Sequence, residues 1–542
     1  MAAELTNPQV ADQLALFAAL LDLADTSPFA VRAYSRAAEL VRSLPTPVAQ
    51  LVREGRIREL RGIGPGIESK LLELVTTGEI AELRDLQAEL PPQLVSYGRL
   101  HGLSTKRISS IARALEITTV PELESAVAEG RLRQVPGIGP ATEAQIAAAL
   151  ARPPQAQRGL TVNRSRALSH DIAGALGGHV AGAARRFCEL AFELCVVVSS
   201  DRPADAIDAF AALPQIMALL ERSERRGVGL TLDGMPIVLV VAGHGALGTE
   251  LVRATGSAEW VDTLGPLPEA ADEADVFAAL GMPFCPPELR ELPGALPPEG
   301  LVDLTDIRGD LHCHTTWSDG RASVLEMGEA ARGRGYAYLA ICDHTPNVGV
   351  VHGLSTHELQ RQGEEIARAN DELAPFRILR GVECDIRADG TLDVEDAVLA
   401  ELEWLQLSLH AGQRRPREEL TKIVTGAMRH PAVRALSHPK GRILNHRPEN
   451  ALDLDEVFSV ARETGVAVEV NRLPDRLDLS AVHVREALAA GVDLVLNSDS
   501  HSPAGLASLE LALATARKGA ATRDRIVNTR PLADVLRKRP SA

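Results

Sequence analysis

The sequence predicts a multidomain α and α/β protein, with a helical N-terminal region, an α/β middle domain and a distorted C-terminal β/α barrel of seven strands. Two observations lead to this prediction. Glycine-rich turns precede helical stretches in the first 150 residues. In the last two-fifths of the chain, apolar strand-like runs alternate with helix-like segments, and each run stops at a potential ligand, as on the active face of a β/α barrel.

Length and composition agree with several domains in one chain. The 542 residues are enough for three or four domains with cores of their own, and we place their boundaries at 1–152, 160–298 and 301–542. Proline-containing stretches at 151–158 and 283–298 are predicted linkers. The chain has neither an apolar run long enough for a membrane span nor a basic N-terminal signal region, so we expect a cytoplasmic protein without a membrane partner.

Two turns in the N-terminal region follow the helix-hairpin-helix pattern. Residues 61–66 (Arg-Gly-Ile-Gly-Pro-Gly) and 135–140 (Val-Pro-Gly-Ile-Gly-Pro) each precede a helical stretch, and a weaker copy at 101–106 lacks the second glycine. Glycine lets the backbone approach a phosphate, and the following helix N-terminus offers free N–H groups. One such turn is often only a turn, but the repetition favours binding of the DNA backbone. The predicted DNA contacts are Gly62, Gly64, Gly66, Lys70, Gly102, Lys106, Gly137 and Gly139.

The formal net charge of −16 argues against broad, nonspecific adhesion to nucleic acid, so the DNA contact is expected to be local and sensitive to salt. Basic side chains near the hairpins are the candidates for this DNA contact, and the alternative is that they only form solvated helix faces.

The C-terminal runs stop at side chains that bind metals. His312 and His314 lie two apart on a strand and point to one face, with Asp319 just beyond. Imidazoles with bridging carboxylates suit Zn²⁺, Mn²⁺ or Fe²⁺ in a cluster of two or three ions, and a water on such ions becomes hydroxide near neutral pH. The pattern therefore favours hydrolysis of a phosphate ester. The further runs stop at His344, Glu383, His410, His438, Asn471 and the pair Asp499 and His501.

Residues from about 307 to 528 resemble a PHP domain, the polymerase and histidinol phosphatase family. The resemblance implies a distorted barrel of seven strands with a trinuclear metal centre. The ligand motifs are matched at His312, His314, Asp319, His344, Glu383, His410, His438, Asp499 and His501, of which His312, His314, Asp319, Asp499 and His501 are the predicted catalytic residues. From their position alone, Lys440, Arg442 and Arg476 are candidates to neutralise a bound phosphate.

The order of helical hairpins, middle domain and PHP domain resembles the bacterial family X DNA polymerases over nearly the whole chain, and stretches at 27–34 and 281–290 are also similar to that family. The resemblance implies a first domain that grips gapped DNA, a palm that adds nucleotides, and a PHP domain that trims 3′ ends, typically with Mn²⁺. Lys70 falls where a related eukaryotic repair polymerase has its lyase lysine, although such a lysine is more often only a phosphate contact.

The middle domain departs from this family at its catalytic positions. The family palm reads Gly-Ser, Arg-Arg and Asp-x-Asp, with a third Asp on a neighbouring strand, and these carboxylates hold two Mg²⁺ ions. Alternate strand positions face the same way, so losing the Asp pair removes the metal site and argues against Mg²⁺ and nucleotide addition here. Arg185 and Arg186 are kept, as phosphate contacts or as a solvated pair, while the altered positions are Ala183, Glu193, Cys195 and Val238.

The resulting hypothesis is a metal-dependent DNA phosphoesterase of DNA repair, acting on gapped DNA or 3′ ends as a 3′-5′ exonuclease, or as an end-processing or abasic-site nuclease, with an inactive polymerase core. Three alternatives stay open: an active family X repair polymerase with a PHP exonuclease, a PHP phosphatase acting on a small phosphomonoester, and a non-catalytic DNA-binding scaffold.

Overall fold

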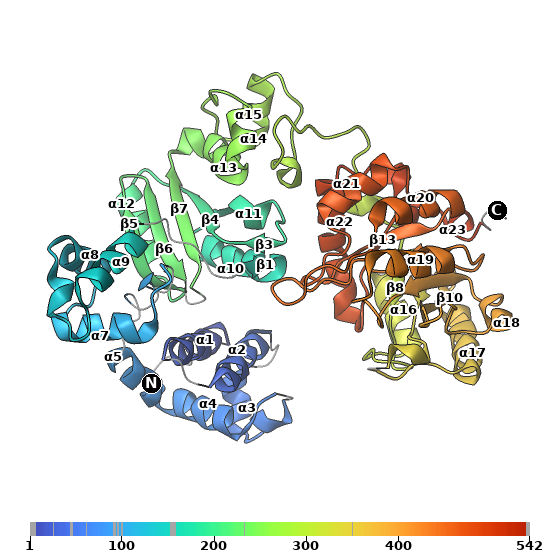
Figure 1. Cartoon of the computed structure of the whole chain (residues 1–542), viewed down its shortest axis with the longest axis horizontal. Coiled ribbons are helices and arrows are strands. Elements are labelled where there is room, and N and C mark those ends of the chain that lie inside the picture. The colour runs from blue at the N-terminus through green and yellow to red at the C-terminus, as the bar shows by residue number, and fades with distance from the viewer. Residues whose placement is uncertain are drawn as a thin grey trace.

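The computed structural model describes residues 7–24, 27–43, 47–60, 62–89, 94, 97–98, 101–151, 159–231, 234–349 and 351–537. Arg61 of the first hairpin and residues 152–158 of the predicted linker lie outside this set. Figure 1 shows three parts in chain order: a helical region in blue, an α/β part in teal and green, and a barrel in yellow to red. This confirms the predicted fold class, whereas the domain boundaries themselves stay predictions.

The helical region forms around one apolar core, which includes Leu14, Leu71 and Leu123. Its last helices also touch the middle part, because Met217 and Leu220 of the neighbouring sheet pack against this core. The helices are α1 (Asn7–Leu23), α2 (Pro28–Ser43), α3 (Val48–Arg53), α4 (Pro65–Thr77), α5 (Ala81–Glu89), α7 (Thr105–Leu115), α8 (Val120–Ala128) and α9 (Pro140–Leu150).

The middle part is built on a five-stranded sheet with the order β2-β4-β7-β6-β5. Only β4 and β7 pair in parallel. The strands are β2 (His179–Ala181), β4 (Leu194–Ser199), β5 (Ile216–Arg222), β6 (Arg226–Thr231) and β7 (Pro236–Ala242), and a short pair, β1 (Leu160–Thr161) and β3 (Leu190–Ala191), lies beside them. The helices are α10 (Val162–Ala175), α11 (Gly182–Arg185), α12 (Pro203–Ala211), α13 (Leu247–Thr255), α14 (Ala258–Asp262) and α15 (Glu273–Ala279).

The C-terminal part is a seven-stranded sheet in which every pair of neighbouring strands is parallel, in the order β14-β13-β12-β11-β10-β9-β8. The two ends of the sheet meet where His314 N–H donates to the Ser500 carbonyl at 2.8 Å, so the sheet curls into a nearly closed barrel. The strands are β8 (Gly309–Cys313), β9 (Tyr338–Ile341), β10 (Arg377–Asp385), β11 (Trp404–Ser408), β12 (Ala435–Leu436), β13 (Ala467–Asn471) and β14 (Leu494–Asn497).

Helices follow the strands of the barrel and cover its outside (Figure 1). Capping boxes at Ser323 and Ser355 start α16 (Val324–Gly333) and α17 (Thr356–Leu373), because each serine accepts from a backbone N–H three residues later while the glutamate at that position accepts from the serine's own N–H. The helices that follow are α18 (Asp396–Leu399), α19 (Arg417–Met428), α20 (Leu454–Thr464), α21 (Ala481–Ala489), α22 (Leu509–Lys518) and α23 (Leu532–Val535). Among the described residues, no helix is both long and apolar enough to cross a membrane.

Candidate metal centre and DNA-binding surface

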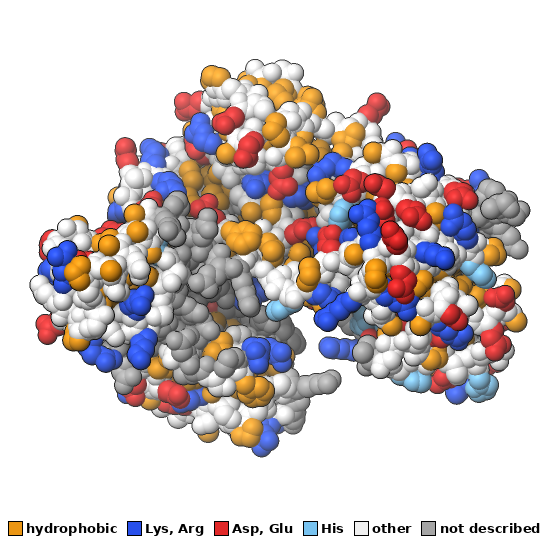
Figure 2. Space-filling model, viewed as in Figure 1, with side chains coloured by type: hydrophobic (Ala, Val, Ile, Leu, Met, Phe, Trp, Pro, Cys, Tyr) orange, Lys and Arg blue, Asp and Glu red, His pale blue; other side chains and the backbone are white. Residues whose placement is uncertain are grey.

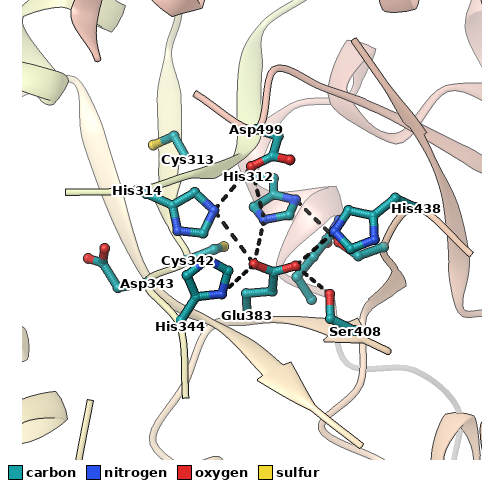
Figure 3. Close-up of polar contacts among 12 residues, drawn as sticks. His312, Cys313, His314, Cys342, Asp343, His344, Glu383, Ser408, His438 and Asp499 are labelled. Atoms are coloured by element: carbon teal, nitrogen blue, oxygen red, sulfur yellow. Dashed lines mark hydrogen bonds and ion pairs between the residues drawn. The ribbon is translucent and has the colours of Figure 1, made fainter. Parts of the chain in front are cut away.

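The predicted ligands converge at one mouth of the barrel. Parallel strands present their carboxyl ends on the same side, so the side chains that end β8, β10 and β14 point inward together (Figure 3). His312, His314 and Glu383 are buried there, whereas Asp319, His410 and His501 are partly open to solvent. The ligands form three sets, and within each set the ligand atoms lie within 4.8 Å of one another. These sets are His312, His314 and Asp499; His314, Asp319, His344 and His501; and His344, Glu383 and His410.

Glu383 stands at the centre of the cluster, and its two carboxylate oxygens face different imidazoles. Oε2 lies 2.9 Å from His344 Nδ1 and 3.4 Å from His312 Nε2. Oε1 lies 3.1 Å from His438 Nε2 and 3.6 Å from His410 Nε2. His438, which belongs to none of the three sets above, therefore reaches the cluster through Glu383, so the structure brings all nine sequence-predicted ligands together.

Unsatisfied buried atoms show that this donor set fits metal ions. His312 Nε2, both ring nitrogens of His314 and Glu383 Oε2 are buried without a hydrogen-bond partner. A buried polar atom with no partner costs free energy, so such atoms are rare unless a ligand satisfies them. Imidazole nitrogens together with carboxylate oxygens suit Zn²⁺, Mn²⁺ or Fe²⁺.

Burial and charge inside the site set the protonation of these side chains, which favours the ligand form at His314 and Glu383 but not at His344. Burial lowers the pKa of His314 to about 4, so its ring is neutral at pH 7. Burial alone raises the pKa of Glu383, but His344, His312 and His410 outweigh it and hold that pKa well below the ordinary value. For His344 burial alone lowers the pKa, yet the Glu383 carboxylate outweighs burial and raises the pKa to about 9. His344 is thus protonated until a metal ion displaces its proton.

A buried carboxylate that sequence reasoning missed orients two of the ligands. Glu469 on β13 accepts from His312 Nδ1 at 2.7 Å and from the backbone N–H of His438 at 2.8 Å. With Nδ1 as the donor, His312 keeps the lone pair of Nε2 free for a metal. The sequence contains a pattern that could have identified Glu469, because this residue interrupts an apolar run and lies two residues before Asn471 on the same strand face.

Asp385 has the same role for His410. It follows Glu383 by two residues on β10, and its Oδ1 accepts from the His410 backbone N–H at 3.0 Å and lies 3.2 Å from His410 Nδ1. Nε2 of His410 is thereby turned toward Glu383. Asn471 holds a further ligand in place, because its side-chain amide donates to Asp499 Oδ2 at 3.0 Å. Hydrogen bonds of this kind hold metal ligands in one orientation.

The three predicted phosphate contacts are differently placed. Lys440 is buried, and its ammonium donates to the carbonyls of Asn450 at 2.8 Å and Leu452 at 3.0 Å. Arg442 is also buried and donates to the Arg476 carbonyl and to a carboxylate of the middle part. The donors of Lys440 and Arg442 are therefore occupied by protein acceptors, which argues against direct contact with a phosphate, while the half-buried Arg476 keeps that role as a prediction.

The altered palm positions meet in space. Cys195 on β4 pairs directly with Val238 on β7, and both are buried. Glu193, one residue before β4, is exposed. At the place where the sequence comparison put three carboxylates, the structure thus has a thiol, an isopropyl group and one solvent-facing acid. Such a set offers no pair of carboxylates to share two Mg²⁺ ions.

The two retained arginines are directed at protein acceptors. Arg185 donates to Glu273 Oε1 at 3.0 Å and to Thr255 Oγ1 at 2.9 Å. Arg186 donates to the Thr255 carbonyl at 2.7 Å and forms an ion pair of 3.3 Å with Glu291. These contacts tie the segment at α11 to the end of α13, to the start of α15 and to Glu291, so they favour a structural role for the pair, and a phosphate contact stays a prediction. Ala183 is half-buried beside them.

The hairpins have the backbone geometry of phosphate-binding turns. Gly62, Gly102 and Gly137 have φ values of +103°, +76° and +84°, a region that other residues rarely adopt. Gly64 and Gly139 cap α4 and α9 without a side-chain hydrogen bond, so the first N–H groups of these helices are open to an anion. The weaker copy at 101–106 begins α7 in the same way.

Lys70 is half-buried between two carboxylates. Its ammonium lies 2.9 Å from Glu82 and 3.4 Å from Glu73. Burial lowers the pKa of Lys70, but the two glutamates outweigh this and raise it above the ordinary value. A lysine held in the charged form is a poor nucleophile, so the environment argues against a lyase role and for a charged contact. Lys106, Gly66 and Gly102 are exposed and accessible to DNA.

A small pocket of about 440 Å³ lies beside the first hairpin and is lined by Phe29, Arg32, Arg36 and Gly62. Phe29 is 76% exposed. Neither arginine forms an ion pair within the part of the chain that the structure describes, and both side chains are exposed. On the face of the molecule drawn in Figure 2, basic and acidic side chains are interspersed, in agreement with a local DNA contact.

Comparisons with known proteins agree with this architecture. A helix-hairpin-helix domain model matches residues 5–80, and a PHP domain model matches residues 310–472. The protein named DNA polymerase/3′-5′ exonuclease PolX of Bacillus subtilis (strain 168) is 30% identical, over 96% of this chain and 97% of its own. A probable phosphatase of Acetivibrio thermocellus is 30% identical over 35% of this chain and 78% of its own, and one of Shewanella oneidensis is 25% identical over 41% and 88%. The chain therefore belongs to the bacterial PolX family, the family X DNA polymerases with a C-terminal PHP domain.

Proposed function

We propose that the protein is a metal-dependent DNA phosphoesterase that shortens 3′ ends as a 3′-5′ exonuclease, and that its polymerase core does not add nucleotides. The observation that carries this proposal is the set of nine converging ligands, in which His312 Nε2 and both ring nitrogens of His314 are buried without a hydrogen-bond partner. The name of the Bacillus subtilis relative, which includes both activities, supports the exonuclease and leaves the polymerase to be tested.

The residues divide the work as follows. Two or three divalent ions held by the nine ligands would supply Lewis acidity and lower the pKa of an attacking water. Glu383 shares its oxygens among the imidazoles and accepts from the Ser408 hydroxyl, which keeps the carboxylate in place. Glu469 and Asp385 hold the rings of His312 and His410 in the tautomer that turns Nε2 inward. The chain's own contribution is thus a preorganised, ionised cage.

The N-terminal region would hold the DNA near this cage. Open helix N-termini after Gly64 and Gly139 suit backbone phosphates, and they carry no information about sequence. Arg32, Arg36 and the exposed ring of Phe29 fit an unpaired strand, since phosphates attract the guanidinium groups and a base stacks on the ring. Gapped DNA and DNA with a free 3′ end are therefore the proposed substrates.

The absence of nucleotide addition rests on the palm. Cys195 and Val238 occupy adjacent positions on paired strands, where two carboxylates would be needed to hold Mg²⁺. A second candidate function, hydrolysis of a small phosphomonoester, is favoured by the relatives named probable phosphatases.

The test is a gel assay with Mn²⁺ and a 5′-labelled primer annealed to a gapped template, with and without dNTPs, beside the double variant His312→Ala, His314→Ala. We expect the primer to shorten with the parent protein and to stay intact with the double variant. Lengthening with dNTPs would refute the inactive palm. An intact primer together with phosphate release from a small phosphomonoester would move the assignment to a phosphatase, and internal or abasic-site cleavage would make the protein an endonuclease.

A further inference from the structure

The palm-like domain contacts the barrel at helix α22, where the Lys518 ammonium donates to the Arg186 carbonyl at 3.2 Å, and at two loops, the one that follows β12 and the one that follows β13. Asn445 of the first loop donates its side-chain amide to the Gly159 carbonyl at 2.9 Å. Leu477 of the second loop packs in an apolar cluster with Val162 of α10 and Leu511 of α22. Figure 1 shows the two parts side by side. The middle part therefore contacts the loops at the carboxyl ends of the barrel strands, which is the face that carries the metal ligands.

Arg442 links both loops to the middle part. Its guanidinium donates to Glu189 through two bonds of 3.0 and 2.6 Å, and Glu189 lies just before β3. The same guanidinium donates to the Arg476 carbonyl at 2.7 Å and to the Leu477 carbonyl. The side chain of Arg442 is only 9% exposed, and Glu189 is the nearer of two carboxylates that neutralise this nearly buried charge, since Glu449 lies 3.6 Å away.

Both loops begin at groups of the metal centre. The ligand His438 lies four residues before Arg442. Asn471, which holds the ligand Asp499 through a bond of 3.0 Å, lies five residues before Arg476. The buried Asp478 joins the loops again, because it accepts from the backbone N–H groups of Lys440 at 3.3 Å and of Gly441 at 2.7 Å. A shift of Arg442 therefore displaces the segments that position His438 and Asp499.

We infer that the palm-like domain acts as a brace for the metal centre, and that Glu189 is a positioning residue that acts on His438 and Asp499 through Arg442. The inference goes beyond the proposed nuclease activity and needs only that the cluster binds divalent ions. It gives the palm a role that does not depend on its polymerase carboxylates, so the domain remains necessary although Cys195 and Val238 have replaced two of them.

The experiment compares Glu189→Ala and Glu189→Gln with the parent in the full chain. A matched control is Glu221→Ala, since Glu221 pairs with Arg226 at 2.9 Å within the same sheet and both side chains are exposed. Each protein is freed of metal with a chelator, and Mn²⁺ binding is measured by isothermal titration calorimetry together with the thermal unfolding midpoint. DNA is absent, so a protein that fails to cut DNA still reports on the brace.

The expected result is that the dissociation constant of the weakest Mn²⁺ site rises about tenfold in both Glu189 variants, in the range known for residues that orient metal ligands, and stays unchanged in the control. The glutamine keeps the size of the side chain, so Glu189→Gln decides the question if Glu189→Ala is insoluble. Unchanged Mn²⁺ affinity in soluble Glu189 variants overturns the inference, even where the unfolding midpoint falls, because Glu189 would then only hold the domains together.

Discussion

Replacing Glu469 by glutamine is the sharpest test of the metal centre, because the structure assigns every acceptor site of this carboxylate. Oε1 accepts from His312 Nδ1 at 2.7 Å, from Gln406 at 2.8 Å and from Asn497 at 2.9 Å. Oε2 accepts from the His438 backbone N–H at 2.8 Å and from Asn471 at 3.3 Å. An amide has only one oxygen, so in either orientation its NH₂ group faces at least two donors.

The magnitude follows from that count. Each buried donor left without an acceptor costs about 1–3 kcal/mol, so two such donors lower the free energy of unfolding of the metal-free protein by about 2–6 kcal/mol. The orientation that leaves only two donors unpaired keeps its oxygen toward His312 and turns the NH₂ group toward the backbone N–H of His438 and the amide of Asn471. The affinity for metal falls about 10- to 100-fold, or about 1.4–2.8 kcal/mol, because the groups that hold the ligands His438 and Asp499 lose their acceptor.

The assay is urea unfolding in the presence of a chelator, combined with Mn²⁺ titration calorimetry. Glu463→Gln is the matched control, because Glu463 pairs with Arg429 on the exposed surface of the same barrel. A Glu469→Gln variant with parental stability and parental Mn²⁺ affinity would refute the assignment of Glu469 as the orienting acceptor.

Three further predictions follow from the same geometry. In the metal-free protein, His344 has a pKa of about 9, above its ordinary value, so its contribution to stability is complete below about pH 6.5 and is lost as the pH rises through 9. Urea unfolding between pH 6 and 10 should show the free energy of unfolding fall over this range, and a flat profile would contradict the assignment. Gly137→Ala should weaken binding of gapped DNA by about 1 kcal/mol, because alanine is strained at φ +84°, and fluorescence anisotropy with Gly333→Ala as the control checks this. Lys70 should form no borohydride-trapped adduct with abasic DNA, since Glu82 and Glu73 keep it protonated, and a trapped adduct that Lys70→Ala abolishes would refute this.

The sequence identified features that depend on a few neighbouring residues. His312 and His314 point to one face because strand side chains alternate, and the other ligands follow apolar runs that become parallel strands with their carboxyl ends on one side. Gly62 and Gly137 were recognised because glycine-rich turns precede helices there, and the structure gives both residues a positive φ. The altered palm was visible for the same reason, since the Asp-x-Asp pattern is local and Cys195 interrupts it.

Only the tertiary structure decided which buried groups meet across the chain. Glu469 lies 157 residues from the His312 ring that it orients, and Glu189 lies 253 residues from Arg442. Lys440 and Arg442 appeared from their position to be phosphate contacts, but burial obliges their donors to find acceptors, and the nearest acceptors are carbonyls and a carboxylate brought there by packing. Local patterns determine which side chains reach the mouth of the barrel, whereas the partners of buried charges depend on how distant segments pack.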